Sequence, residues 1–243
     1  MAKFDQYKRR FFRRVGVLSA ALASGAWAPS SGAAPVKTTN LTGEQVLQLL
    51  KDGNARFMAD KPEPVVQGRE RRLALARSQT PIAVLVSCSD SRVPPELLFG
   101  RGLGELFIVR NAGNTVDTVA LGSIEYAVAK LGVPLIVVMG HERCGAVEAA
   151  VSVVEKQALF PGSLGPMVEP IIPAVLHAKA QLAGKKYTAD ALLDASVREN
   201  VRRVVKRLRE SEPILLEPLR AKKLMIVGAR YDLDDGSVEF FSA

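Results

Sequence analysis

Residues 82–95 read Ile-Ala-Val-Leu-Val-Ser-Cys-Ser-Asp-Ser-Arg-Val-Pro-Pro, an apolar run that ends in polar residues and prolines. Short apolar runs of this kind, bounded by turn residues, are typical of strands buried on both faces of a parallel sheet. The prolines must end the strand, because proline cannot donate to a sheet ladder. Ligands of open α/β sheets bind at the carboxyl ends of strands, so Cys88, Asp90 and Arg92 are candidate functional residues. If the chain stays extended here, these three side chains point to the same side.

A second apolar run, residues 134–140, leads directly into residues 141–145, which read His-Glu-Arg-Cys-Gly. Two thiols and one imidazole, delivered from two strand ends, form a set of metal-binding side chains. Three protein ligands leave a fourth position for water or substrate, which is the pattern of catalytic rather than closed structural zinc sites. The sequence therefore predicts a Zn²⁺ site formed by Cys88, His141 and Cys144.

The chain has only two cysteines, so a disulfide or a pair of inert buried thiols is the alternative role for Cys88 and Cys144. A disulfide is a common fate of paired cysteines in exported proteins. The presence of Asp90, Arg92 and His141 close to the thiols favours a metal, because a disulfide gains nothing from these side chains.

The formal net charge of +8 does not indicate a nucleic-acid partner. Residues 1–33 hold six basic residues and one acidic residue, so the rest of the chain carries only about +3. An excess this small predicts no polyanionic partner. The glycine patterns of phosphate loops and dinucleotide-binding folds are also absent from the sequence. We therefore expect no nucleic-acid partner.

Residues 1–33 are predicted to be an export signal that precedes a single catalytic domain at residues 34–243. The signal begins with a basic segment and continues with an apolar one, residues 15–28, that is too short for a stable membrane span. The sequence Arg9-Arg10-x-Phe12 resembles the twin-arginine pattern, with Lys8 where Ser or Thr is usual. Twin-arginine export carries folded proteins, so a thiolate site can be loaded with metal before it meets an oxidising compartment. We expect delivery to the periplasm; an uncleaved amphipathic anchor is the alternative.

Strand-like and helix-like segments alternate along the rest of the chain. The predicted strands cover residues 82–86, 106–109, 134–140, 224–229 and 238–241. The predicted helices cover residues 40–60, 68–78, 118–130, 145–155, 171–183 and 188–210, with a proline- and glycine-rich loop at residues 160–170. This alternation favours an α/β fold with a mainly parallel central sheet and helices on both faces. Residues 234–237, Asp-Asp-Gly-Ser, predict a hairpin turn, which makes the last strand an antiparallel edge strand.

The motifs of this chain together resemble those of the β-class carbonic anhydrases, over about residues 42–241. The motifs that carry the resemblance are Cys88-x-Asp90-x-Arg92, His141-x-x-Cys144 and, between them, Arg110-Asn111-Ala112-Gly113-Asn114. The resemblance implies zinc-dependent, reversible hydration of CO₂ to bicarbonate and a proton by attack of zinc-bound hydroxide. It also implies a homodimer or a larger homo-oligomer.

The resemblance further implies roles for single residues. Cys88, His141 and Cys144 match the zinc ligands of the family. Asp90 and Arg92 match its paired carboxylate and guanidinium, which act as catalytic residues. A bidentate pair with Arg92 would hold Asp90 off the metal, where Asp90 accepts a hydrogen bond from zinc-bound hydroxide. Without that pair, Asp90 would be a fourth ligand in a closed state.

Four further positions are implied to bind the substrate: Gln79, Phe107, Tyr126 and Gly145. The pocket of the family lies at a dimer interface. We therefore expect Gln79, Phe107 and Tyr126 to serve the zinc of the neighbouring subunit.

Two other functions remain open for the same residues. One is hydrolysis of CS₂ or COS at the same zinc site, since the difference lies in access to the pocket. The other is a non-catalytic zinc protein, in which Asp90 closes the site as a fourth ligand. His177 is a proton-shuttle candidate by residue type alone, and an ordinary surface or core histidine is the favoured interpretation.

Replacing both Arg9 and Arg10 with Lys should block export and leave folded, zinc-loaded enzyme in the cytoplasm, because the basic charge of the segment is preserved while the arginine pair is lost. Cell fractionation and immunoblotting measure the outcome. Unaltered periplasmic delivery of the Lys-Lys variant would show that the chain uses the general secretion route or another signal.

Overall fold

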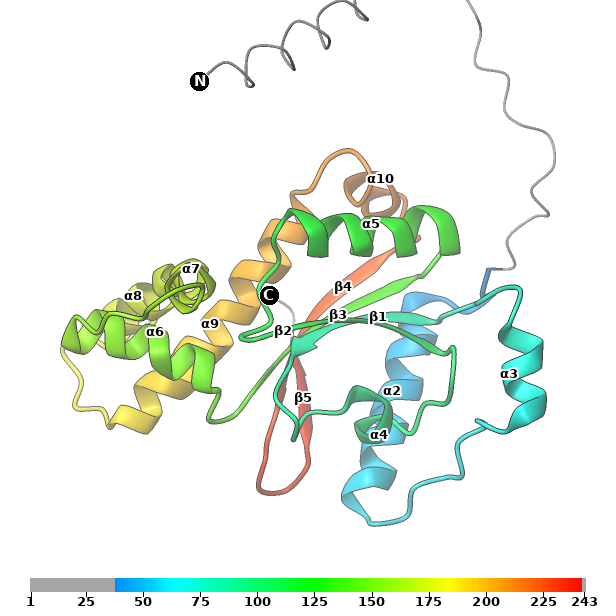
Figure 1. Ribbon diagram of the computed structural model, residues 1–243, viewed down its shortest axis with the longest axis horizontal. Coiled ribbons are helices and arrows are strands. Elements are labelled where there is room, and N and C mark those ends of the chain that lie inside the picture. Colours follow the sequence, from blue (N-terminus) through cyan, green and yellow to red (C-terminus); the bar gives the residue numbers. More distant parts are fainter. Residues whose placement is uncertain (1–37, 242–243) are drawn as a thin grey trace, which may run out of the picture. The chain divides into compact units, whose positions relative to one another are not determined.

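The computed structural model describes residues 38–241, so the predicted export signal, residues 1–33, lies outside the described residues. Five strands form one sheet in the order β2-β1-β3-β4-β5, in which the first four are parallel and β5 is antiparallel to β4 (Figure 1). The strands are β1 (Ala83–Cys88), β2 (Leu106–Asn111), β3 (Leu135–His141), β4 (Met225–Tyr231) and β5 (Val238–Phe241). The predicted α/β fold and its antiparallel edge strand are confirmed.

The helices within residues 38–241 either precede β1 or lie in the connections between the strands. They are α2 (Gly43–Met58), α3 (Arg69–Leu75), α4 (Pro95–Leu98), α5 (Thr118–Leu131), α6 (Gly145–Lys156), α7 (Leu164–Val168), α8 (Ile172–Gln181), α9 (Ala189–Arg209) and α10 (Leu216–Arg220), with a 3₁₀ turn η1 at Glu169–Ile171. None of them combines the length and the apolar character that a membrane crossing needs.

Helices cover both faces of the sheet, and every residue of β1 is buried. Val84 and Val86 pack with α5 and α9 on one face, whereas Leu85 packs with α2 and α4 on the other. This division follows from the alternation of side chains along a strand. Burial on both faces explains why the apolar run of β1 is continuous rather than alternating.

A third group of buried side chains lies at the carboxyl end of the sheet, where α6, α7 and α8 gather beside the first half of α9 (Figure 1). Cys88 and Cys144 belong to this group, together with apolar residues such as Val147 and Ile171. The two thiols are therefore enclosed by helices and not by the sheet alone.

The structure differs from the sequence predictions at three places. Strand β1 ends at Cys88, so Asp90 and Arg92 lie in a turn rather than on an extended continuation of the strand. The predicted loop at residues 160–170 instead contains α7 and most of η1, because proline is tolerated in the first turn of a helix and only breaks a helix further along. The short helices α4 and α10 were not predicted, and Pro95 occupies the first position of α4 for the same reason.

Candidate metal centre

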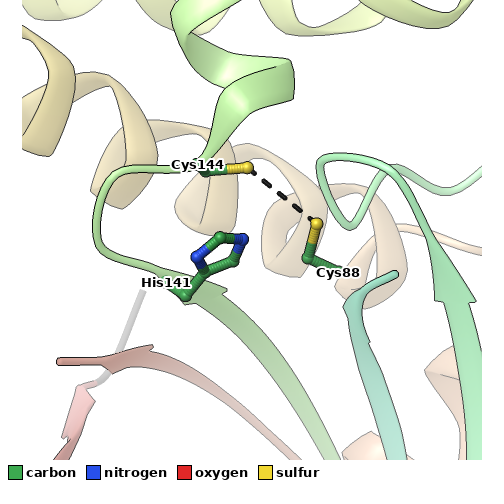
Figure 2. Close-up of side chains that lie close together, drawn as sticks. All are labelled: Cys88, His141 and Cys144. Carbon is green, nitrogen blue, oxygen red and sulfur yellow. Dashed lines mark hydrogen bonds between the residues drawn. The ribbon is translucent and has the colours of Figure 1, made fainter. Parts of the chain in front are cut away.

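Three side chains converge where β1, β3 and α6 meet (Figure 2). Cys88 is the last residue of β1, His141 the last residue of β3, and Cys144 the residue before α6. Because β1 and β3 are neighbouring parallel strands, their carboxyl ends bring Cys88 and His141 together. The turn between His141 and α6 then folds Cys144 back toward both, and all three side chains are buried. The structure thus unites the three predicted ligands.

The two sulfur atoms are not bonded to each other. The Sγ atoms of Cys88 and Cys144 lie 4.0 Å apart, about twice the length of a disulfide bond, and both cysteines are free. The two sulfurs and a ring nitrogen of His141 all lie within 4.8 Å of one another. The alternative of a disulfide is therefore wrong for this structure.

The imidazole of His141 is oriented for metal binding. Its Nδ1 lies 2.9 Å from the carbonyl oxygen of Glu142, and because a carbonyl only accepts, Nδ1 carries the proton. The lone pair is then on Nε2, which is buried and has no hydrogen-bond partner. Buried polar atoms almost always have a partner, so this nitrogen fits a metal ligand better than a structural side chain.

The two thiols are close enough to change each other's ionisation. The contact with Cys144 lowers the pKa of Cys88, and the backbone N–H of Gly113, which donates to Cys88 Sγ at 3.3 Å, acts in the same direction. The bond to Cys88 and burial raise the pKa of Cys144. Two sulfurs this close therefore share one proton, which a metal ion would displace.

Asp90 is held beside this group by Arg92. Nε and Nη2 of Arg92 donate to Oδ1 and Oδ2 of Asp90 at 3.0 and 2.8 Å, and the backbone N–H of Arg92 donates to Oδ1 at 2.9 Å. These bonds hold the pKa of the Asp90 carboxyl well below its usual range, so Asp90 stays ionised at neutral pH. Oδ2 lies 3.9 Å from Nε2 of His141. The predicted bidentate pair is present, although a turn and not a strand creates it.

Arg110 is a further contributor for which the sequence analysis proposed no role. Located on β2 beside β1, it donates from Nε to the carbonyl of Cys88 at 2.8 Å and from Nη2 to the carbonyl of Asp90 at 2.7 Å. One guanidinium thus fixes the backbone on both sides of Ser89. The only feature of the sequence that pointed to Arg110 was its position directly after the predicted strand at residues 106–109, at the start of the motif Arg110-Asn111-Ala112-Gly113-Asn114.

The predicted substrate positions do not all lie near the three ligands of the same chain. Gln79 is exposed and precedes the amino end of β1, whereas the ligands lie at the carboxyl end of that strand. Phe107 pairs with Val84 in the first half of its strand, and its ring lies 6.5 Å from that of Tyr126, which is 51% exposed. Only Gly145, exposed at the start of α6, adjoins a ligand.

His177 has a partner away from the three ligands. Its Nδ1 lies 2.8 Å from Oε1 of the buried Glu199, and its side chain is 53% exposed. The favoured interpretation of His177 as an ordinary histidine agrees with this contact.

A second group that could hold a metal lies nearby, formed by Glu142, Asp232 and Asp234. Its carboxylates already pair with guanidinium groups. Arg143 donates to both oxygens of Asp234 at 3.0 and 2.6 Å, and Arg230 pairs with Asp232 at 3.0 Å. We therefore treat this group as a neutralised ion-pair network rather than a metal site.

Comparisons with known proteins converge on one family. A family model described as "Carbonic anhydrase" matches residues 83–238. The chain is 43% identical over 193 residues to a carbonic anhydrase of Mycolicibacterium smegmatis, covering 79% of this chain and 90% of that protein. It is 41% identical over 187 residues to carbonic anhydrase 2 of Mycobacterium tuberculosis, covering 77% and 87%.

The solved structures give the same result. A β-carbonic anhydrase from Aspergillus fumigatus matches with a TM-score of 0.64 and 27% identity, covering 82% of this chain and 89% of that chain. A tetrameric β-carbonic anhydrase from Sordaria macrospora also reaches a TM-score of 0.64 at 27% identity, covering 70% and 85%.

Replacing Cys88 or Cys144 with Ser, or His141 with Ala, should each remove most of the bound metal from the purified protein, which should otherwise hold one ion per chain. Elemental analysis after gel filtration measures the metal content. Asp234→Asn is the matched control, because it alters the second group without touching the three ligands. A disulfide between Cys88 and Cys144 in active protein, or metal lost only from the control, would contradict this assignment.

Proposed function

The chain belongs to the carbonic anhydrase family, in its β class, and we propose that it hydrates CO₂ reversibly at a zinc ion held by Cys88, His141 and Cys144. One observation carries the proposal for zinc. A ring nitrogen of His141 lies within 4.8 Å of two buried sulfurs at the ends of two adjacent strands, and the buried Nε2 of the same ring has no hydrogen-bond partner. Two sulfurs and one nitrogen are ligands that Zn²⁺ prefers.

The donor set fits a catalytic zinc ion. Two thiolates and a neutral imidazole neutralise its charge, and three ligands leave one position free. When bound, zinc supplies a Lewis acid that makes water nucleophilic near neutral pH.

Asp90 has two tasks in this proposal. As an ionised carboxylate it only accepts hydrogen bonds, so it can orient the attacking water by accepting the proton that points away from CO₂. The bonds from Arg92 engage both of its oxygens and keep it from moving onto the metal. The 3.9 Å distance between Oδ2 and Nε2 of His141 puts the carboxylate beside the ligand atoms.

The alternatives from the sequence are less well supported. A closed, non-catalytic zinc site needs Asp90 as a fourth ligand, but Asp90 is not part of the group of ligand atoms and is paired with Arg92. Hydrolysis of CS₂ or COS would use the same ligands. The relatives at 41–43% identity are named carbonic anhydrases, which favours CO₂.

Assembly into a dimer or larger oligomer would complete the pocket. Strand β2 is an edge strand with half-buried side chains, α3 has no buried residue, and Tyr126 is exposed on α5. The structurally similar protein of Sordaria macrospora is tetrameric. We propose that Gln79, Phe107 and Tyr126 reach the zinc of a neighbouring subunit. We also propose delivery to the periplasm, which is supported by the sequence of residues 1–33 alone.

Asp90 and Arg92 should act together, so that a change in either residue impairs the same step. Arg92→Ala should free the carboxylate to bind zinc, so that zinc stays bound while CO₂ hydration, measured by stopped flow across pH, falls by orders of magnitude. Arg92→Lys should restore little, because an ammonium cannot reproduce the bidentate geometry. Asp90→Asn should also be weak, since an amide accepts the hydrogen bond of the water less well.

The double variant Asp90→Asn/Arg92→Ala should be little worse than the poorer single variant, because each change disables the same contact. Losses that multiply would mean that the two residues act independently. The wild-type assay also tests the function itself, with CS₂ and COS offered in parallel. Hydrolysis of these gases without CO₂ hydration would refute the proposed substrate.

Subunit mixing should test the shared pocket. Gln79→Ala and Cys88→Ser subunits are each expected to be inactive alone, but co-expressed mixtures should regain about a quarter of the active sites. Half of a random set of dimers is mixed, and each mixed dimer has one intact zinc set facing an intact Gln79. A mixture of Cys88→Ser with Asp90→Asn is the matched control and should recover nothing. No recovery in the first mixture, or a fully active monomer by light scattering, would contradict the shared pocket.

A further inference from the structure

The turn after β2 presents a backbone donor to a metal ligand. Asn111 ends β2, and its carbonyl accepts hydrogen bonds from the backbone N–H groups of Ser89 and Asn114 at 3.0 and 3.3 Å. Gly113, inside this turn, directs its N–H at Cys88 Sγ. Its φ of +77° lies in the left-handed region, and a Cβ there would come within 2.6 Å of Ile171 Cδ1. The left-handed φ and the close contact favour glycine here, and glycine has little conformational preference of its own.

A buried side chain from the distant helix α9 holds this turn from its other side. Nδ2 of Asn200 donates to the carbonyl of Gly113 at 2.8 Å, across 87 residues of sequence. Asn200 is only 2% exposed. The neighbouring residues Val197 and Val201 pack so closely on Gly140, the residue before His141, that a Cβ there would lie 2.9 Å from each. The backbone that carries Asn200 is therefore fixed against β3.

We propose that Asn200 is a positioning residue of the metal centre, which acts through Gly113 to keep a backbone N–H directed at the Cys88 thiolate. The hydrogen bond to the carbonyl of Gly113 fixes the dihedral angles that glycine would otherwise leave free. The inference rests on the proposal that Cys88 binds zinc, and it adds a role for a helix that contributes no ligand.

The proposed effect is electrostatic. An N–H bond withdraws negative charge from a thiolate and orients its lone pairs, so it tunes how strongly the sulfur binds the metal. Partners of this kind, one step removed from the metal, typically change metal affinity by about tenfold to a hundredfold. Since Asn200 acts on the donor rather than on the sulfur, we expect the lower end of this range.

Asn200→Leu, which has a similar size and no donor, tests the proposal in the zinc-loaded full-length enzyme. Transfer of zinc to a chromogenic chelator should become about tenfold faster, and the thiolate-to-cobalt absorption band of the Co²⁺-substituted protein should shift. Asn200→Ser is the second variant, in case the larger apolar side chain prevents folding. It should give the same two changes, because a shorter side chain cannot reach the carbonyl of Gly113.

Asn54→Leu is the matched control. Asn54 is also a buried Asn that bonds distant backbone groups, since it donates to the carbonyl of Gly236 and accepts from the N–H of Val238, both at 2.9 Å. It lies on α2, across the sheet from α9, and bonds no ligand-bearing segment. It should lower stability but leave both the zinc transfer and the cobalt band unchanged. Equal effects of Asn54→Leu and Asn200→Leu, or no effect of the latter, would overturn the proposal.

The wild-type protein provides a test without any substitution. In the zinc-loaded state the amide of Gly113 should exchange with solvent far more slowly than amides of exposed turns, because it is bonded to a buried sulfur. Fast exchange of this amide would refute the role of Asn200. If the wild-type protein binds no zinc at all, the proposed function fails instead, so the two failures are distinguishable.

Discussion

The parallel pairing of β1 with β3 is the constraint on which the metal centre depends. Both strands are buried on both faces, so their register is set by apolar packing on two sides and cannot slip without exposing a core. Their shared carboxyl edge therefore delivers Cys88 and His141 to one point. Everything else at the centre, including the turn that carries Asp90 and the return of the chain at Cys144, is arranged around these two fixed ends.

The sequence was sufficient for the fold and for the grouping of Cys88, His141 and Cys144, because both depend on local patterns. An apolar run followed by a break predicts a strand end, and chemistry at two such ends predicts a shared site. The sequence was not sufficient for Arg110 and Asn200. Their contacts are with backbone atoms 20 to 87 residues away, and the position of those atoms follows from tertiary packing rather than from any local pattern. The helix α7 was not predicted for a different reason. Prolines occur both in loops and in the first turns of helices, so the prolines of residues 160–170 did not distinguish the two.

Within one chain, some of the predicted pocket residues lie at the opposite end of the sheet from Cys88, His141 and Cys144. Gln79 precedes β1 and Cys88 ends it, so five residues of extended strand, 83–87, lie between them, a span of about 17 Å. No rearrangement of one chain brings them together while the strand persists. A pocket that contains both must therefore be built from two chains. Only the assembled protein would then have a complete site, so dissociation on dilution would lower the activity.

Hydrogen bonds from different elements hold the Cys88 and His141 segments of the metal centre, and these bonds keep the buried side chains in place. The Cys88 half is held by Arg110 on β2 and, through the turn at Gly113, by α9. The His141 half is held from the direction of β4, where the N–H of Glu142 donates to the carbonyl of Tyr231 at 2.9 Å. Bonds from the protein itself thus fix the positions of Cys88 and His141. A buried imidazole nitrogen without a partner and two buried thiols whose sulfurs lie 4.0 Å apart are unfavourable in a protein interior. Metal binding removes both defects at once, so zinc should stabilise the fold as well as supply its chemistry.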